Sequence, residues 1–226
     1  MTSSTILLRL HAPLQHWGCH ASSNRVQSTQ TWPTKSGVLG LVANALGRSY
    51  DADISDLVGL TFGVRLDQRG SVMFDYIAMR NLACSNGKVK TSHELWRWLL
   101  ADAVFLAGLS GERNLLEQIE VALRNPARAL YLGKRSCPPT PPLCLGIVDT
   151  DLTHALQEYP WLGRPEHPDL DPTTLLSVIE DPDGDELLRD VPAGAFIERR
   201  FTDRRVSWCS MPVVMPTPVV EEQAIV

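Results

Sequence analysis

A short basic segment beside glycine and tyrosine is the most distinctive chemical group in this sequence. Lys134, Arg135 and Ser136 follow Tyr131 and Gly133, just before a proline cluster. Arginine offers a planar fork for phosphate oxygens, lysine a point charge and serine a hydroxyl. Glycine lets the backbone approach a phosphate closely, and tyrosine can stack on a base. The segment predicts a phosphate-binding loop, while a surface turn with two solvated cations is the alternative.

Two further basic clusters lie elsewhere in the sequence. Both are typical of nucleic-acid binding, because grouped cations neutralise phosphates and a ring among them can stack on a base. Glu198 and Asp203 could instead neutralise the later cluster in ordinary surface pairs, and the earlier cluster could be a solvated loop. The clusters are Lys88, Lys90, His93 and Arg97, and Arg199, Arg200, Phe201, Arg204 and Arg205.

A helix start that contains glycine is another candidate anion site. Lys35, Ser36 and Gly37 follow Thr34, and apolar residues then repeat every three or four positions up to Gly47. The free N–H groups and the positive dipole end of such a helix favour an anion. The Walker spacing and the GxGxxG pattern are both absent, which disfavours a nucleotide cofactor. A simple capped helix is the alternative interpretation.

The histidines do not indicate a metal centre. Those within residues 11–20 match no zinc-ligand spacing, and no pair of Asp or Glu follows a metal-nuclease pattern. We therefore expect no metal and no cofactor. Metal-free RNA cleavage by His93 with Tyr131 or Lys90 stays an alternative, because residue type alone does not establish catalysis.

Composition and charge favour one large intracellular domain with an uneven charge distribution. The 226 residues contain neither an apolar run of about 18 residues nor a signal-peptide pattern, and the five scattered cysteines fit reduced thiols. We expect a cytoplasmic protein with no membrane partner. Residues 149–190 hold 12 acidic and 2 basic residues, whereas the rest holds 14 acidic and 19 basic ones. Nucleic-acid binding is therefore compatible with the overall charge of −5, because the contacting face decides it.

Hydrophobic patterning predicts an α+β fold. The expected order is strand, helix, strand, inserted polar hairpin, strand, helix, strand and a C-terminal addition, which matches a ferredoxin-like or RRM-like arrangement. Two helices are expected to cover one face of an antiparallel sheet. The acidic segment is expected to contain one short helix. Strands are expected at 5–11, 60–66, 72–78, 103–109, 143–148 and 196–208, and helices at 34–47 and 112–124.

Three segments resemble the CasD subunit family of type I-E CRISPR Cascade. They are LRLHAPLQHWG at 8–18, PTKSGVLGL at 33–41 and LGKRSCP at 132–138. They resemble the family patterns LRLxxPxQxWG, PT[RK]SGxxGL and LG[RK]RSCP, in the family's order along the chain. Weaker similarity occurs at 96–105 and 199–201. No family motif is recognised in residues 149–195 or in the tail after 210.

The resemblance implies a repeat-associated RNA-binding fold. Its parts would be a ferredoxin-like palm over 1–148, an inserted thumb hairpin at about 80–98, and a C-terminal extension over 149–226 packed on the palm. It implies a non-catalytic subunit that caps the 5′ handle of the guide RNA (crRNA), joins the Cascade backbone and large subunits, and meets target DNA only through the complex. In the type I-C branch the corresponding subunit is a metal-independent endoribonuclease that processes repeat RNA, which stays the alternative.

The resemblance also implies roles for individual residues. The basic loop (Lys134, Arg135 and Ser136) and the helix start (Lys35, Ser36 and Gly37) are expected to hold handle phosphates. Gln15 and Tyr131 are expected to lie near bases. The expected RNA contacts of the thumb cations and of the C-terminal arginines are inferred from their charge alone and not from a family motif. The residues carried over from the motifs are Gln15, Trp17, Gly18, Lys35, Ser36, Gly37, Gly133, Lys134, Arg135 and Ser136.

Overall fold

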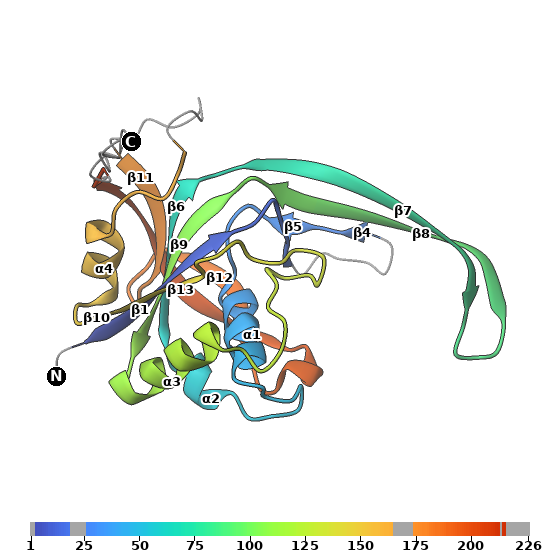
Figure 1. Cartoon of the computed structure of the whole chain (residues 1–226), viewed down its shortest axis with the longest axis horizontal. Helices are drawn as coiled ribbons and strands as arrows, with labels where there is room; N and C mark the ends of the chain where they lie inside the picture. The colour runs from blue at the N-terminus through green and yellow to red at the C-terminus, as the bar shows by residue number, and fades with distance from the viewer. Residues whose placement is uncertain (1–2, 19–25, 165–173, 213, 216–226) are drawn as a thin grey trace, which may run out of the picture.

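The computed structural model of the chain is built around one large antiparallel sheet, shown in Figure 1. It describes residues 3–18, 26–164, 174–212 and 214–215. Within these ranges the sheet has seven strands in the order β10-β1-β9-β6-β11-β13-β12. Their bounds are β1 (Ser4–His11), β6 (Thr61–Gln68), β9 (Val104–Gly111), β10 (Cys144–Val148), β11 (Thr174–Glu180), β12 (Glu186–Pro192) and β13 (Phe201–Pro212).

The first two thirds of the chain, up to Val148, follow the predicted element order. Helix α1 (Lys35–Ala45) comes between β1 and β6, and α3 (Arg113–Arg124) comes between β9 and β10. Helix α1 begins where predicted, because the side chain of Thr34 accepts a hydrogen bond from the N–H of Gly37. Both helices place their periodic apolar residues in one large core with alternate residues of β1 and β9. The two helix predictions are confirmed to within two residues at each end.

The last third of the chain, which includes the acidic segment, adds strands to the sheet. Strand β11 pairs with β6, β13 pairs with β11, and β12 forms the edge beside β13. The one expected helix is present as α4 (Leu152–Glu158), but β11 and β12 also lie in the region. Strand β11 is buried on both faces, so it lacks the alternation that marks a half-exposed strand.

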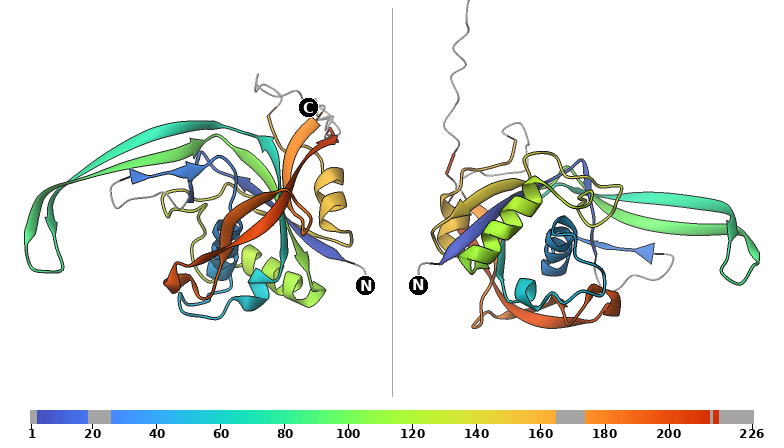
Figure 2. Two further views of the ribbon diagram at one scale, coloured as in Figure 1. Left: turned by 180° about the vertical axis from the view of Figure 1, so that it is seen from behind. Right: turned by 60° about the horizontal axis from the view of Figure 1, so that its bottom comes forward.

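The two predicted helices, α1 and α3, pack on one face of the sheet as expected, and α4 covers the other face. Helix α4 forms a second apolar cluster with Leu7, Leu106 and Ile179. Figure 2 shows α4 across the sheet from α1. None of the helices in the described ranges is long and apolar enough to cross a membrane.

A long two-stranded arm leaves the sheet between β6 and β9 (Figure 1). Strands β7 (Ser71–Ala83) and β8 (Val89–Ala101) pair along their whole length. The arm is longer than the expected hairpin at 80–98, because the predicted strand at 72–78 is part of it. The remaining short elements are β2 (Leu14–Gln15), β3 (Trp17–Gly18), β4 (Val26–Gln27), β5 (Thr29–Gln30), α2 (Ser55–Val58) and the 3-10 helix η1 (Phe196–Glu198).

A buried ion pair fastens the segment after α4 to the sheet. Arg65 and Asp67 have fully buried side chains, and Arg65 Nε lies 2.7 Å from Asp67 Oδ1. Arg65 also donates to the carbonyl oxygens of Tyr159 and Pro160, at 2.6 and 3.0 Å. Burial raises the pKa of the Asp67 carboxyl, and the hydrogen bonds from Arg65 act against that rise. This pair holds the chain on its way from α4 toward β11.

Candidate nucleic-acid interface

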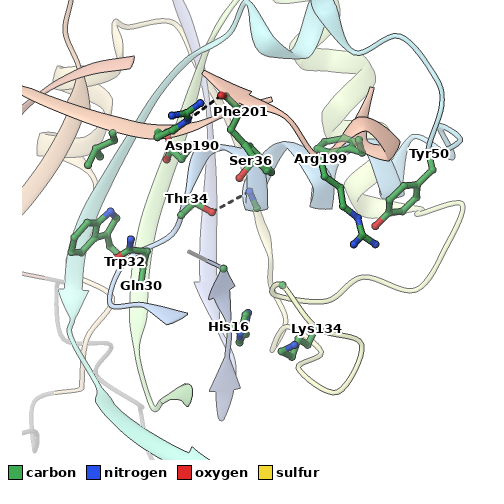
Figure 3. Close-up of a pocket in the computed structure, with 16 residues that line it drawn as sticks. His16, Gln30, Trp32, Thr34, Ser36, Tyr50, Lys134, Asp190, Arg199 and Phe201 are labelled. Atoms are coloured by element: carbon green, nitrogen blue, oxygen red, sulfur yellow. Dashed lines mark hydrogen bonds between the residues drawn. The ribbon is translucent and has the colours of Figure 1, made fainter. Parts of the chain in front are cut away.

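The three motif segments meet at one cavity beside the start of α1. The cavity has a volume of about 640 Å³, and Figure 3 shows the residues that line it. Residues from all three segments contribute to the wall: Gly18, Ser36, Gly37, Gly133 and Lys134. The first and the last of these segments are more than 100 residues apart in sequence. The structure therefore brings together one part of each segment that the sequence marked.

A second, smaller cavity of about 210 Å³ adjoins the first. The two cavities share Ser36, Gly37, Tyr50, Gly133 and Phe196 in their walls. The second one reaches toward the half-buried Tyr131, the residue expected near a base, and toward Arg48 and Arg128. The two cavities therefore lie side by side along α1.

The basic loop is locked onto the segment that contains His16. The N–H of His16 donates to the carbonyl oxygen of Leu132 at 3.1 Å. The loop itself is a tight turn, in which the N–H of Cys137 donates to the backbone carbonyl oxygen of Lys134 at 2.8 Å. Gly133 has φ of +82°, and a Cβ atom there would lie 1.6 Å from the carbonyl oxygen of His16. Glycine is required at 133 by this contact between two backbones.

Lys134 brings an unneutralised charge to the cavity. Within the described part of the chain its ammonium contacts the amide oxygen of Gln27 and forms no ion pair with a carboxylate. Burial lowers the pKa of Lys134, and the nearby charge of Arg97 lowers it further. A bound anion would relieve this repulsion between cations. Arg135 and Ser136 are exposed on the same turn.

His16 is an uncharged neighbour of this cation. Its side chain lines the cavity but is 92% buried, since its relative exposure is 8%. Burial lowers its pKa to about 4, and the charge of Lys134 acts in the same direction. The imidazole is therefore neutral at physiological pH, and the positive potential of this wall comes from lysine and arginine.

The start of α1 is largely occupied by the protein itself, which corrects the expected phosphate site there. The ammonium of Lys35 is buried and pairs with Glu180 at 2.8 Å. The N–H of Lys35 donates to Asp190 Oδ2 at 2.8 Å, and the N–H of Gly37 is taken by the capping hydroxyl. Ser36 remains half-buried in the cavity wall. Lys35 and Gly37 thus shape the site, while the side chains of Thr34 and Ser36 lie in its wall.

Gln15 and Trp17 form the floor beneath this helix start rather than a surface for bases. Both side chains are buried. The Gln15 amide donates to the carbonyl oxygen of Ala103 at 2.7 Å and accepts from the Trp17 indole at 3.0 Å. A Cβ atom on Gly37 would lie 2.9 Å from the Trp17 ring. The expected contact of Gln15 with a base is replaced by this internal support.

The C-terminal arginines separate into different roles. Arg199 lines the cavity and is exposed, with no side-chain partner within the described residues. Arg204 is buried and pairs with the carboxylate of Asp190 at 2.6 Å, so its expected contact with RNA is corrected. Arg200 forms a surface ion pair with Glu198, as the alternative interpretation proposed. A final contact joins Arg205 to the carbonyl oxygen of Gly184 at 2.9 Å.

The cations of the arm lie along β8 and the turn that precedes it. Lys88 and Lys90 are near the tip, and Lys90 Nζ lies 3.0 Å from His93 Nδ1. Arg97 is nearer the base of the arm and is bound to Asp75. The pair of His93 with Tyr131 is not assembled, because Tyr131 lies beside α1 in the body.

Several aromatic residues of the interface carry no sequence signal that separates them from core residues. Tyr50 and Phe196 line both cavities, and Trp32 lines the larger one. Trp32 directly precedes the motif at 33–41, which is the one hint that the sequence offers. Within the described ranges, no three His, Cys, Asp or Glu side chains gather as a metal site would require.

Known proteins share both this sequence pattern and this fold. The family model described as CRISPR-associated protein (Cas_Cas5) matches residues 5–207. The CRISPR system Cascade subunit CasD of Escherichia coli (strain K12) is 35% identical, over 71% of this chain and 79% of that protein.

Two solved structures have the same fold over nearly the whole chain. A structure described as a Cas protein has a TM-score of 0.76 and 41% identity, covering 95% of this chain and 100% of that one. A chain of a CRISPR RNA-guided surveillance complex has a TM-score of 0.81 and 27% identity, covering 97% and 96%.

Proposed function

Because this chain belongs to the CRISPR-associated protein (Cas_Cas5) family, we propose that it is a guide-RNA-binding subunit of a Cascade-type antiviral surveillance complex. It binds the 5′ handle of the crRNA without cutting it and acts in the cytoplasm. It joins the backbone subunit to the large subunit, and it meets target DNA only through the complex. The similarity to a Cascade subunit and to a chain of an RNA-guided surveillance complex supports this assignment.

The observation that carries the proposal is the cavity where the motif segments meet. Its wall combines Lys134 and Arg199, neither of which is paired with a carboxylate of the described residues. Aromatic rings line the same space. Cations that follow a backbone beside rings that stack on bases are what a protein uses to bind a single strand.

The parts of the fold take corresponding roles in this proposal. Strands β10, β1, β9 and β6 lie in the order of a ferredoxin-like sheet, and with α1 and α3 they form the palm. The arm of β7 and β8 is the thumb that contacts the guide and a neighbouring subunit, with Lys88, Lys90 and His93 toward its tip. The C-terminal strands widen the palm, and the connection between β12 and β13 supplies Arg199 to the RNA.

The dependence of RNA binding on salt tests the basic loop. Binding of handle RNA should weaken as salt rises, since each neutralised phosphate contributes a slope of about −0.7 in log K against log salt. Replacing Lys134 and Arg135 by alanine should reduce the slope by roughly 1.4. The matched control replaces Arg113 and Arg124, two exposed arginines of α3. An unchanged slope in the first variant, or an equal change in the control, would refute the assignment.

A cleavage assay tests the non-catalytic part of the proposal. The purified chain should leave repeat RNA intact in the presence of EDTA. The contact of His93 with Lys90 is the arrangement that would support the endoribonuclease alternative. A discrete cut product that disappears in His93→Ala would establish that alternative and overturn the binding-only role.

A further inference from the structure

Tyr50 stands at the junction of the two cavities with most of its ring exposed. Its relative exposure is 66%, and it lines both hollows. An aromatic ring left in water where two cavities meet offers a flat apolar surface that the fold itself does not use.

The ring is held in place from the C-terminal region. The N–H of Ile197 donates to the carbonyl oxygen of Tyr50 at 3.0 Å. The ring of Phe196 lies 6.5 Å away, centroid to centroid, tilted by 59°. Two contacts thus fix the loop after α1 against η1, so the exposed ring is positioned before any ligand arrives.

Cations flank the exposed ring. Arg199 follows η1 with φ of +50°, and Figure 3 shows it beside Tyr50, with Lys134 and His16 on another side of the hollow. Neither Arg199 nor Lys134 has a carboxylate partner in the described residues. A single-stranded RNA whose sugar–phosphate backbone passes between these two cations would bring a base to the ring of Tyr50.

We propose that Tyr50 is the stacking platform for one unpaired base of the RNA, with Arg199 and Lys134 holding the adjoining phosphates. The inference rests on the proposed function and adds to it a residue that no motif marks. It also makes the C-terminal region part of the RNA site. Because every base has a π-face, the contact tolerates any base at that position.

Base-specific fluorescence of the full-length chain tests the platform. Single-stranded RNA with the handle sequence carries 2-aminopurine at one position at a time, and stacking quenches the probe. Tyr50→Leu should restore fluorescence at one position and weaken binding by about 5- to 150-fold, the range that stacking of one base provides. Tyr50→Phe keeps the ring and should behave as the unmodified chain does.

The salt dependence separates stacking from charge. Tyr50→Leu removes no cation, so its slope of log K against log salt should stay unchanged, whereas Arg199→Ala should reduce the slope by about 0.7. Thermal unfolding of Tyr50→Leu shows whether the variant is folded.

Each failure has a distinct meaning. If the unmodified chain does not bind handle RNA, the proposed function fails. If it binds but Tyr50→Leu binds equally well with the same quenching, the platform is wrong. Loss of binding to another Cascade subunit with RNA binding intact would overturn the inference in favour of a protein contact.

Discussion

The carbonyl oxygen of His16 occupies the space that a side chain on Gly133 would need. The resulting backbone contact ties two motif segments that are separated by more than 100 residues. It explains in steric terms why the basic loop contains glycine at this position.

Alanine at 133 should therefore be more damaging than alanine at another glycine of the same conformation. Gly87 offers that control, because its φ of +75° resembles the +82° of Gly133, but nothing lies within 4 Å of its Cβ position. Gly87→Ala should cost about 1 kcal/mol of unfolding free energy from its conformation alone. Gly133→Ala should cost more and should also weaken RNA binding. Equal losses in denaturant titrations would contradict the steric explanation.

Removing one partner of the buried ion pair should destabilise the chain strongly. Arg65→Met leaves the Asp67 carboxylate buried without its cation, and we expect a loss of about 3–5 kcal/mol in the free energy of unfolding. The double variant Arg65→Met/Asp67→Leu should recover part of this loss. As a control, Arg113→Met breaks only exposed pairs and should cost about 1 kcal/mol or less. Strictly additive single effects would argue against coupling.

The stability of the chain should depend on pH through His16. Its pKa is lowered to about 4, from about 6.5 in the unfolded chain, so the unfolded state binds more protons between these values. The free energy of unfolding should fall as the pH is lowered through this window. His16→Gln should show a smaller fall, whereas His93→Gln, on the arm, should follow the unmodified chain. A parallel fall in all three would exclude His16 as the cause.

Thiol labelling should distinguish the cysteine of the arm from those of the body. Cys84 lies beside the turn of the arm, whereas burial raises the pKa of Cys137, Cys144 and Cys209. Cys19 lies outside the described residues, so the experiment uses a Cys19→Ser background. The thiol of Cys84 should react rapidly in the native chain, and the other three thiols should react only on unfolding. A rapid phase that survives Cys84→Ser would contradict this order.

Local sequence patterns were sufficient to predict the element order up to Val148. The helical spacing of Val38, Leu41 and Val42, with the Thr34 cap, specifies α1 because each signal acts within a few residues. Strands β11 and β12 escaped prediction because one is buried on both faces and turns rich in aspartate surround them. The arm is longer than the predicted hairpin at 80–98, since alternation alone does not separate a body strand from an arm strand.

The candidate site was predictable by segment but not by side chain. Residue types and spacing identified the basic loop and the start of α1. They could not reveal that Lys35 pairs with Glu180, 145 positions later, or that Arg204 pairs with Asp190. Whether a cation is free or neutralised depends on such distant partners. For the same reason, Tyr50 became a candidate only when the tertiary structure placed it beside Arg199.

The dependence of α1 on β11 and β12 has a consequence for the order in which the chain matures. The carboxylates that meet the backbone and side chain of Lys35 leave the ribosome 155 and 145 residues after it. A nascent chain that has emerged only as far as β10 contains β1, β6, β9 and β10. The ammonium of Lys35 then lacks the carboxylate of Glu180. Under the proposed function, a chain that ends before β11 and β12 would therefore lack two carboxylates that order the guide-binding surface beside α1.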